Sequence, residues 1–318
     1  FYSNRLLGKY WRVILDGTGV ACFEERHCDN CLYEKRTYKD GRKVTVYYHK
    51  VLEAKLILGD KIVVSLGTEF IENERSDVSK QDCETKAAKR LLERIKKEYP
   101  RLPICIQGDA MYATEPMMEI CRLNGWKYIF SHKEAQQRVL ADNYNLLSLE
   151  DGKQKVQGIG AEKGTAIYCN GIGKMAGKTE IMNVYEYTCK KIIKKQEKTV
   201  HFQWITDIEL TRRNLEEMVR AGRGRWKIEN EGFNNQKNGI YHIQHLNSRN
   251  SNAMKNHYLL TQIADILMQL YLAWNPIIKE IKQSIKNTSS RLLESFRRQP
   301  VTDEDVHYIL RYTTIYLE

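Results

Sequence analysis

Cysteine is scarce in this sequence, and long hydrophobic runs are missing. Eight Cys among 318 residues are too few for a fold held together by disulfides. Cys105, Cys121 and Cys169 lie in apolar runs, where reduced thiols are commonly buried. The most apolar long stretch, residues 258–274, is interrupted by three polar residues, which excludes a membrane-spanning helix there. With no recognisable signal peptide, we expect an intracellular protein.

Motifs of several enzyme classes are also missing. We find no nucleophilic Ser or Cys constellation and no Gly-rich loop of the kind that cradles nucleotide phosphates. Internal repeats and low-complexity tracts are absent from the sequence as well. The sequence opens with Phe1 rather than Met, and we expect an N-terminal region of a longer protein to be missing from it.

Acidic residues are outnumbered by basic ones. The 51 Lys and Arg against 40 Asp and Glu give a net charge of +11. Nucleic acid is the commonest partner of such a protein, because each neutralised phosphate releases counterions, although basic proteins without such a partner exist. Within residues 151–200 the lysines form a local cluster, whose members are Lys190, Lys191, Lys194 and Lys195.

Three acidic residues lie where a two-metal phosphoryl-transfer site would need them. Asp16 ends the apolar run 13–15, Asp109 ends the run that begins at 104, and Glu229 lies at the start of a stretch with helical character. A carboxylate at the end of a buried strand projects rigidly past the sheet edge. Mg²⁺ prefers such oxygen ligands, and two ions about 3.5–4 Å apart activate the attacking oxygen and stabilise the leaving one.

Each acid also has an ordinary structural explanation. Asp16 fits the start of a turn, Asp109 fits a cap on the segment that follows it, and Glu229 fits an ion pair with Arg225 four residues earlier. The prediction of a metal site therefore depends on the three acids together.

The order of predicted elements indicates an α/β fold. Strands are predicted at 10–15, 44–48, 52–58, 61–70, 104–107 and 127–130, helices at 82–98 and 114–123, and a loop at 21–42. A meander of three strands around the Asp16 strand, followed by helix, strand, helix and strand, is the ribonuclease H-like arrangement, in which both Asp end neighbouring central strands. A helix between two strands supplies the crossover that a parallel pair requires.

The second half of the chain changes character at about residue 143. Glycine-rich pieces alternate with β-type runs up to residue 206, and helices are predicted at 210–220 and 252–275. We therefore predict a ribonuclease H-like mixed sheet with flanking helices, interrupted by a β-rich insertion and followed by C-terminal helices. The predicted division is 1–142 for the first part of the catalytic domain, 143–206 for the insertion, 207–275 for the remainder and 276–318 for a helical tail.

The block Arg225-Trp226-Lys227-Ile228-Glu229, together with the two Asp, resembles the DDE transposases of bacterial insertion sequences, specifically the insertion-sequence-4-like superfamily. The resemblance covers about residues 5–274. It implies a transposase that cleaves and joins double-stranded DNA, acts as a homodimer on DNA in the bacterial cytoplasm at the nucleoid, and uses two Mg²⁺ or Mn²⁺ ions. A metal-activated water and then a DNA 3′-hydroxyl would serve as successive nucleophiles.

By this resemblance, Asp16, Asp109 and Glu229 are the catalytic metal ligands, and Arg225 contacts the phosphate near the cleaved end. The family also has a Tyr three residues before that Arg and a Lys seven residues after the Glu. Here Gly222 and Gln236 occupy those positions, with Lys237 one residue further on. The family's insertion supplies a Trp that stacks on a displaced base; Trp204 is the candidate, and a core Trp on a strand is the alternative.

Two alternative functions compete with the transposase hypothesis, one of them enzymatic and the other limited to DNA binding. The first is a ribonuclease H-like nuclease or resolvase that cuts DNA without strand transfer and needs the same metal cage. The second is a domesticated DNA-binding protein that has lost catalysis; retention of all three acids argues against it.

Two histidine-containing motifs are candidate metal sites. Cys28 and Cys31 have the spacing of half a tetrahedral zinc site, to which His27 or His49 could add a nitrogen ligand; unligated thiols in a turn are the alternative. His242 and His245 would share one face of a helix, but no carboxylate motif accompanies them, and a surface or DNA-facing role is favoured.

Overall fold

One large mixed sheet organises the chain in a computed structural model that describes residues 1–25, 27–149, 152–174, 181–193, 196–245, 247–248, 250–275 and 284–312. It contains ten strands in the order β2-β3-β1-β5-β6-β10-β9-β8-β7, with β4 paired to the other side of β3. The strands of the first half are β1 (Trp11–Phe23), β2 (Leu32–Thr37), β3 (Lys43–Ile57), β4 (Val63–Ile71), β5 (Ile104–Gly108) and β6 (Lys127–Ser131).

The centre of the sheet has the predicted connectivity. β1 pairs antiparallel with β3 and parallel with β5, and β5 pairs parallel with β6. Helices α1 (Glu84–Glu98) and α2 (Glu115–Leu123) provide the two crossovers. The ribonuclease H-like arrangement predicted from the sequence is confirmed by this order of strands.

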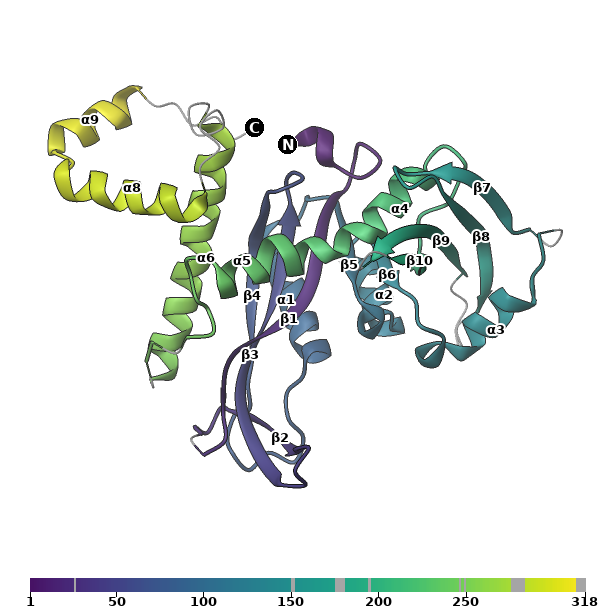
Figure 1. Cartoon of the computed structure of the whole chain (residues 1–318), viewed down its shortest axis with the longest axis horizontal. Coiled ribbons are helices and arrows are strands. Elements are labelled where there is room, and N and C mark those ends of the chain that lie inside the picture. Colours follow the sequence, from purple (N-terminus) through teal and green to yellow (C-terminus); the bar gives the residue numbers. More distant parts are fainter. Residues whose placement is uncertain are drawn as a thin grey trace.

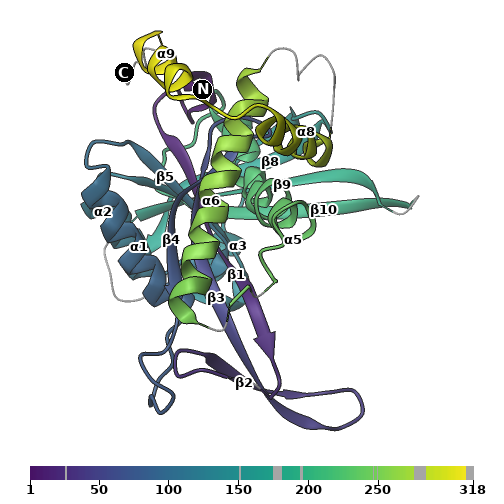
Figure 2. The same cartoon turned by 90° about the vertical axis from the view of Figure 1, so that its left-hand side faces the viewer.

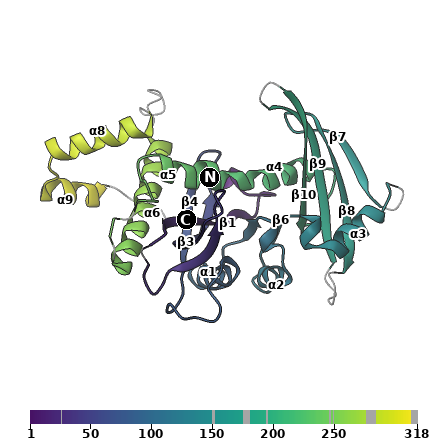
Figure 3. The same cartoon turned by 60° about the horizontal axis from the view of Figure 1, so that its bottom comes forward.

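Helices α1 and α2 cover one face of the sheet (Figure 3). The apolar residues of α1 recur at helical spacing, so one side of the helix is buried against Val13 and Leu15 of β1. Tyr112, in the short helix η2 (Ala110–Tyr112), joins the same core. This packing determines where β1 and β5 lie relative to the first turn of α1. The candidate site lies beside that turn.

The opposite face is crossed by an interrupted helix. α4 (Leu215–Arg223) continues through the short helix η4 (Gly224–Trp226) and the π-helical η5 (Ile228–Asn234) into α5 (Asn235–Asn238), as Figure 1 shows. From the sequence, an uninterrupted α-helix was expected over the stretch that begins near Glu229. Local π-helix is often found at functional sites.

The predicted β-rich insertion extends the central sheet. Its strands are β7 (Gln154–Ile159), β8 (Gly164–Lys174), β9 (Ile181–Ile193) and β10 (Gln196–Thr206). They are antiparallel to one another, and β10 joins the core by pairing with β6. The short helices η3 (Glu134–Gln136) and α3 (Arg138–Leu146) connect β6 to this part, and η1 (Tyr2–Asn4) precedes β1.

The predicted loop at 21–42 is partly wrong. β1 continues past Asp16 to Phe23, residues 32–37 form β2, and the two strands predicted within 44–58 are one long β3. The ends of these strands project from the sheet as an arm (Figures 1 and 2). β2 was missed because all but one of its side chains are partly or fully exposed and most are polar, so it lacks the alternation that marks a strand.

Helix α6 (Ser251–Trp274) turns its polar side inward. Gln262 and Asp265 are buried, whereas Leu260, Ile263 and Leu267 are more than half exposed. Gln262 accepts a hydrogen bond from the buried Lys55 ammonium at 2.6 Å. The apolar stripe of α6 therefore faces away from the sheet.

The C-terminal part contains α8 (Ile285–Arg298) and α9 (Asp303–Tyr312), which lie beyond α6 in Figure 1. Over the described part of the chain, none of the helices has the length and apolar character to cross a membrane.

Candidate active site

Asp16 and Asp109 occupy matching positions on neighbouring parallel strands. Ile14 pairs with Gln107, so two residues further on the same register sets Asp16 beside Asp109. Side chains in register on adjacent strands point to the same face of a sheet. The carboxylates therefore lie together, with Asp16 within β1 and Asp109 directly after β5.

The Asp16 carboxylate is under electrostatic strain. Burial raises its pKa from the usual 3.8 to about 6; the Arg225 guanidinium opposes this shift, and the negative charges of Glu84 and Asp109 add to it. Arg225 Nη1 lies 3.9 Å from Asp16 Oδ2. A half-buried carboxylate with two acidic neighbours and one guanidinium 3.9 Å away is a place where an added cation would be stabilised.

Asp109 is held in place by the chain that follows it. Its Oδ1 accepts a hydrogen bond from the Met111 amide at 2.9 Å, which caps η2. The capping role considered from the sequence is therefore real. It leaves the second carboxylate oxygen available, so it does not exclude a metal-binding role.

Glu84 is a fourth acid at the site, which the sequence analysis missed. It lies in the first turn of α1, is ion-paired with Lys50, and accepts a hydrogen bond from the Tyr112 hydroxyl at 3.0 Å. Acids in the first turn of a helix are common because they favour the helix dipole. Nothing in the sequence therefore indicates that Glu84 approaches Asp16.

Gly17 permits this approach. A Cβ atom added at Gly17 would lie 2.5 Å from Glu84 Cδ. Any side chain at this position would displace the Glu84 carboxylate from Lys50 and Tyr112. Gly17 therefore leaves the space that the Glu84 carboxylate occupies.

The segment that carries Glu229 packs on the same face of β1 as Asp16. Ile228 is fully buried against Ile14 and Ile57, and Ile14 shares its face with Asp16 two residues later. Ile228 therefore anchors this turn in the core. Arg225, one turn earlier, faces Asp16.

Glu229 and Glu231 differ in their surroundings. Glu229 is exposed, whereas Glu231 is half-buried and its Oε2 is buried without a hydrogen-bond partner among the described residues. The three predicted ligands are not drawn into one tight cluster: in the described part of the chain, only Cys28, Cys31 and His49 bring three ligand atoms within 4.8 Å of one another.

Trp204 is a core residue, so its predicted role in stacking on a displaced base does not fit this structure. It is 3% exposed and stacks on Tyr185 and Phe202. A Cβ atom added at Gly222 would lie 2.6 Å from the Trp204 ring. The indole therefore fills the space beside the position where the resembled family has its Tyr, which explains why only Gly fits there.

Gln236, at the position where the resembled family has a Lys, also lies in the core. Gln236 is fully buried and donates to Gln262 at 2.9 Å and to Asp265 at 2.7 Å. Lys237 is half-buried, with its ammonium 5.8 Å from the centre of the Phe233 ring.

Two lysines of the predicted cluster, Lys190 and Lys191, lie on β9 and form ion pairs. Lys190 pairs with Glu197 at 3.0 Å, and Lys191 lies 3.5 Å from Glu162. Lys194 and Lys195 lie outside the described residues.

Glu162 also links this region to the candidate site. It accepts two hydrogen bonds from Arg223 of α4, at 2.9 and 2.7 Å, and these bonds lower its pKa to about 2.

A groove of about 540 Å³ lies along the arm and is lined by residues of β1, β2 and β3. Lys50, the partner of Glu84, lines it together with Tyr48 and Arg36. His242 and His245 are exposed and lie in a loop rather than on a helix, so the predicted shared helix face does not form.

Comparison with protein families shows a match to the transposase DDE domain over residues 7–266. This range includes both strand-borne Asp and the segment with Glu229. Comparison with curated protein sequences finds no match.

Proposed function

The chain belongs to the transposase DDE domain family, and from that premise we propose that it is a cut-and-paste DNA transposase of the insertion-sequence-4-like type. Its reaction would be hydrolytic cleavage at transposon ends followed by transfer of the 3′-hydroxyl to target DNA. The observation that carries the proposal is the proximity of Asp16 on β1 to Asp109 directly after the parallel strand β5, with Arg225 of the segment that holds Glu229 3.9 Å from Asp16.

We assign Asp16, Asp109 and Glu229 as the ligands of two Mg²⁺ or Mn²⁺ ions. The donor set fits, because all three side chains offer carboxylate oxygens and burial leaves Asp16 short of positive charge. When bound, such ions activate the attacking oxygen and stabilise the leaving oxygen.

The remaining residues position the acids and the phosphate. The Arg225 guanidinium lies 3.9 Å from Asp16, from where it would contact a DNA phosphate held at the site. Glu84, fixed by Lys50 and Tyr112, keeps negative charge beside Asp16. Lys50 and Arg36 line the groove of the arm, paired with Glu84 and Glu34; both would exchange these partners for phosphates if the DNA backbone follows the groove.

Cutting two ends together requires two active sites, so we infer a homodimer on DNA. The exposed apolar stripe of α6 is a surface that a second copy could cover. Such a protein would work at nucleoid DNA in the bacterial cytoplasm.

The test uses DNA carrying the inverted repeats that flank the gene. With Mg²⁺, the protein should cut at the repeat ends, and with precut ends it should join them to a target plasmid. Cleavage without joining would replace the transposase with a ribonuclease H-like nuclease or resolvase. Binding with neither reaction would indicate a domesticated DNA-binding protein.

A further inference from the structure

Two cysteines and one histidine, remote from the acidic residues in sequence, meet at the base of the arm. The Sγ atoms of Cys28 and Cys31 are 3.4 Å apart, and each lies 3.4 Å from His49 Nε2. These three ligand atoms form an equilateral triangle. In the described chain it is the only group of three that is so closely spaced.

The fold produces this triangle from two separate elements. Cys28 and Cys31 flank a tight turn in which the Cys31 amide donates to the Cys28 carbonyl at 3.2 Å. His49 lies on β3, and because Leu32 pairs with Tyr48 in the antiparallel register, the residue before Leu32 faces the residue after Tyr48. Strand pairing therefore brings His49 to Cys31 across 18 residues of sequence.

We propose that Cys28, Cys31 and His49 bind one Zn²⁺ ion. Zinc binds Cys sulfur at about 2.3 Å and His nitrogen at about 2.0–2.1 Å. A point about 2.2 Å from each corner of the triangle lies about 1 Å above its plane, as in a tetrahedral ion with three protein ligands. The fourth position is solvent-facing, because Cys28 is only partly buried whereas Cys31 and His49 are buried.

One backbone contact suits a sulfur ligand, against the burial that raises the pKa of the metal-free Cys31 thiol. The Cys28 amide donates to Cys31 Sγ at 3.2 Å, an interaction that stabilises a thiolate sulfur. His27 is exposed and stacks on Tyr47, so its ring is engaged away from the triangle. Cys22, the remaining nearby thiol, is exposed on β1 and is not part of the group.

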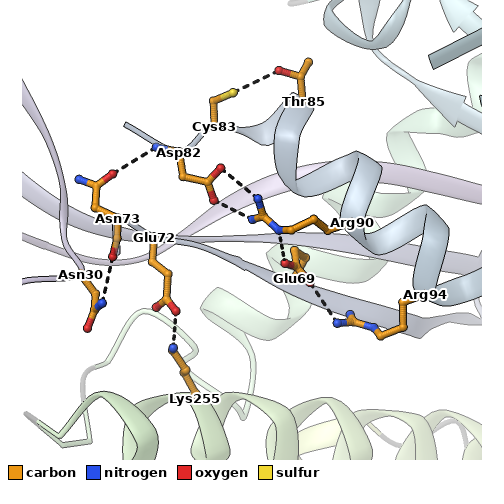
Figure 4. Close-up of polar contacts among 10 residues, drawn as sticks. All are labelled: Asn30, Glu69, Glu72, Asn73, Asp82, Cys83, Thr85, Arg90, Arg94 and Lys255. Atoms are coloured by element: carbon orange, nitrogen blue, oxygen red, sulfur yellow. Dashed lines mark hydrogen bonds and ion pairs between the residues drawn. The ribbon is translucent and has the colours of Figure 1, made fainter. Parts of the chain in front are cut away.

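The zinc loop, defined here as residues 28–31, is connected to the start of α1 by hydrogen bonds. Asn30 and Asn73 are joined by a side chain to backbone bond of 2.9 Å, and the Asp82 amide donates to Asn73 Oδ1 at 3.1 Å, as Figure 4 shows. Asn73 also donates to the Cys31 carbonyl at 2.8 Å. Glu84 begins α1 two residues after Asp82, so an ion at the zinc loop would stabilise the base of the arm and the helix start beside Asp16.

The test measures metal in the 318-residue chain. Protein expressed with zinc and dialysed should contain about one Zn²⁺ per chain by elemental analysis. Replacement of zinc by Co²⁺ should give the visible absorption of a tetrahedral ion together with a sulfur-to-cobalt charge-transfer band. Removal of zinc should lower the melting temperature by about 5 °C or more, because the ion binds only the folded arrangement.

Variants identify the ligands. Cys28→Ser, Cys31→Ser and His49→Ala should each lose the zinc, whereas the matched control Cys22→Ser should keep it. Less than about one tenth of an ion per chain, equal zinc in all variants, or a Cys28–Cys31 disulfide in place of the metal would overturn the proposal. Cobalt spectra of the unsubstituted chain decide the matter even if a variant fails to fold. None of these measurements depends on DNA cleavage, so the zinc site and the transposase proposal succeed or fail separately.

Discussion

The carboxyl group of Asp16 is 27% exposed, and burial raises its pKa to about 6. In the unfolded chain its pKa returns to its usual value near 4. A group whose pKa is raised by folding contributes stability that is present at low pH and is lost as pH rises through the folded pKa. The metal-free protein should therefore lose stability between about pH 4 and pH 6 on account of Asp16.

The substitution Asp16→Asn tests whether the negative charge of Asp16 lowers the stability of the metal-free protein. The full pKa shift corresponds to about 3 kcal/mol, which partial exposure reduces to about 2 kcal/mol. The metal-free variant should be more stable than the unsubstituted protein by that amount at pH 7 and equally stable at pH 4. Denaturant titrations at both pH values measure the difference. Equal stability of the variant and the unsubstituted protein at pH 7 would mean that burial does not raise the pKa of Asp16.

Residue chemistry explains which site residues the sequence could reveal. Asp16 and Asp109 were predictable because each follows an apolar run that forms a strand. The position of Glu84 was not predictable, because its proximity to Asp16 depends on where α1 packs along the sheet. Trp204 was assigned a DNA contact by analogy, but Gly222 leaves a space that its ring fills.

At the scale of elements, β1 and α1 meet at Gly17 and Glu84. Gly17→Ala should destabilise the protein by about 1–2 kcal/mol, because its methyl group displaces the Glu84 carboxylate from Lys50 and Tyr112. With Glu84→Ala in place, the same substitution should cost much less. A double-mutant cycle measured by chemical denaturation gives the coupling energy; additive effects would show that the two residues do not interact.

Helix α6 shows where hydrophobic pattern alone misleads. Its existence and length were predictable, but only Met254 and Tyr258 of its apolar residues are buried, whereas Leu260, Ile263 and Leu267 face away from the sheet. The inward face instead carries Gln262 and Asp265, which join Gln236 and Lys55 in a buried polar network. No sequence pattern distinguishes an apolar stripe that faces the core from one that faces a partner.

If the α6 stripe is the dimer surface, polar substitutions there should separate the protomers. Leu260, Ile263 and Leu267 are 64%, 54% and 63% exposed, so their replacement by Gln should leave the fold intact. Light scattering of the DNA complex should then report one chain in place of two. Leu123→Gln on α2, where the side chain is 70% exposed, is the control. An unchanged dimer would place the interface elsewhere.

For the whole molecule, the net charge of +11 leads to a prediction about DNA affinity. Replacing Lys190, Lys191, Lys194 and Lys195 with Gln should weaken binding to all sequences alike. It should also reduce the slope of log affinity against log salt by about 0.9 for each phosphate that the variant no longer neutralises. The ion pairs of Lys190 and Lys191 with Glu197 and Glu162 would have to open on binding.

The control for this measurement replaces four exposed lysines: Lys86, Lys89 and Lys97 of α1 and Lys80 in the loop before it. Helix α1 lies on the opposite face of the sheet from α4 (Figure 3). Replacing these lysines should leave the salt dependence unchanged. If both sets have the same effect, the lysine cluster is not the DNA path.

At the same scale, the sequence predicted the connectivity of the central sheet but not its extent. Strand and helix patterns are local, so they specified the crossovers through α1 and α2. Whether β7 to β10 form a separate unit or extend the sheet depends on the pairing of Trp204 to Thr206 with β6. That pairing is a tertiary interaction that periodicity does not encode.

The most direct test of the central claim is Mg²⁺-dependent cleavage of a DNA end by four single variants. Asp16→Asn, Asp109→Asn and Glu229→Gln should each lose at least about 10²-fold in cleavage rate while retaining DNA affinity. Glu231→Gln, altered two residues away in the same π-helical segment, should stay within about fivefold of the unsubstituted protein. Full activity in any of the first three variants, or an inactive Glu231→Gln beside an active Glu229→Gln, would contradict the proposed site.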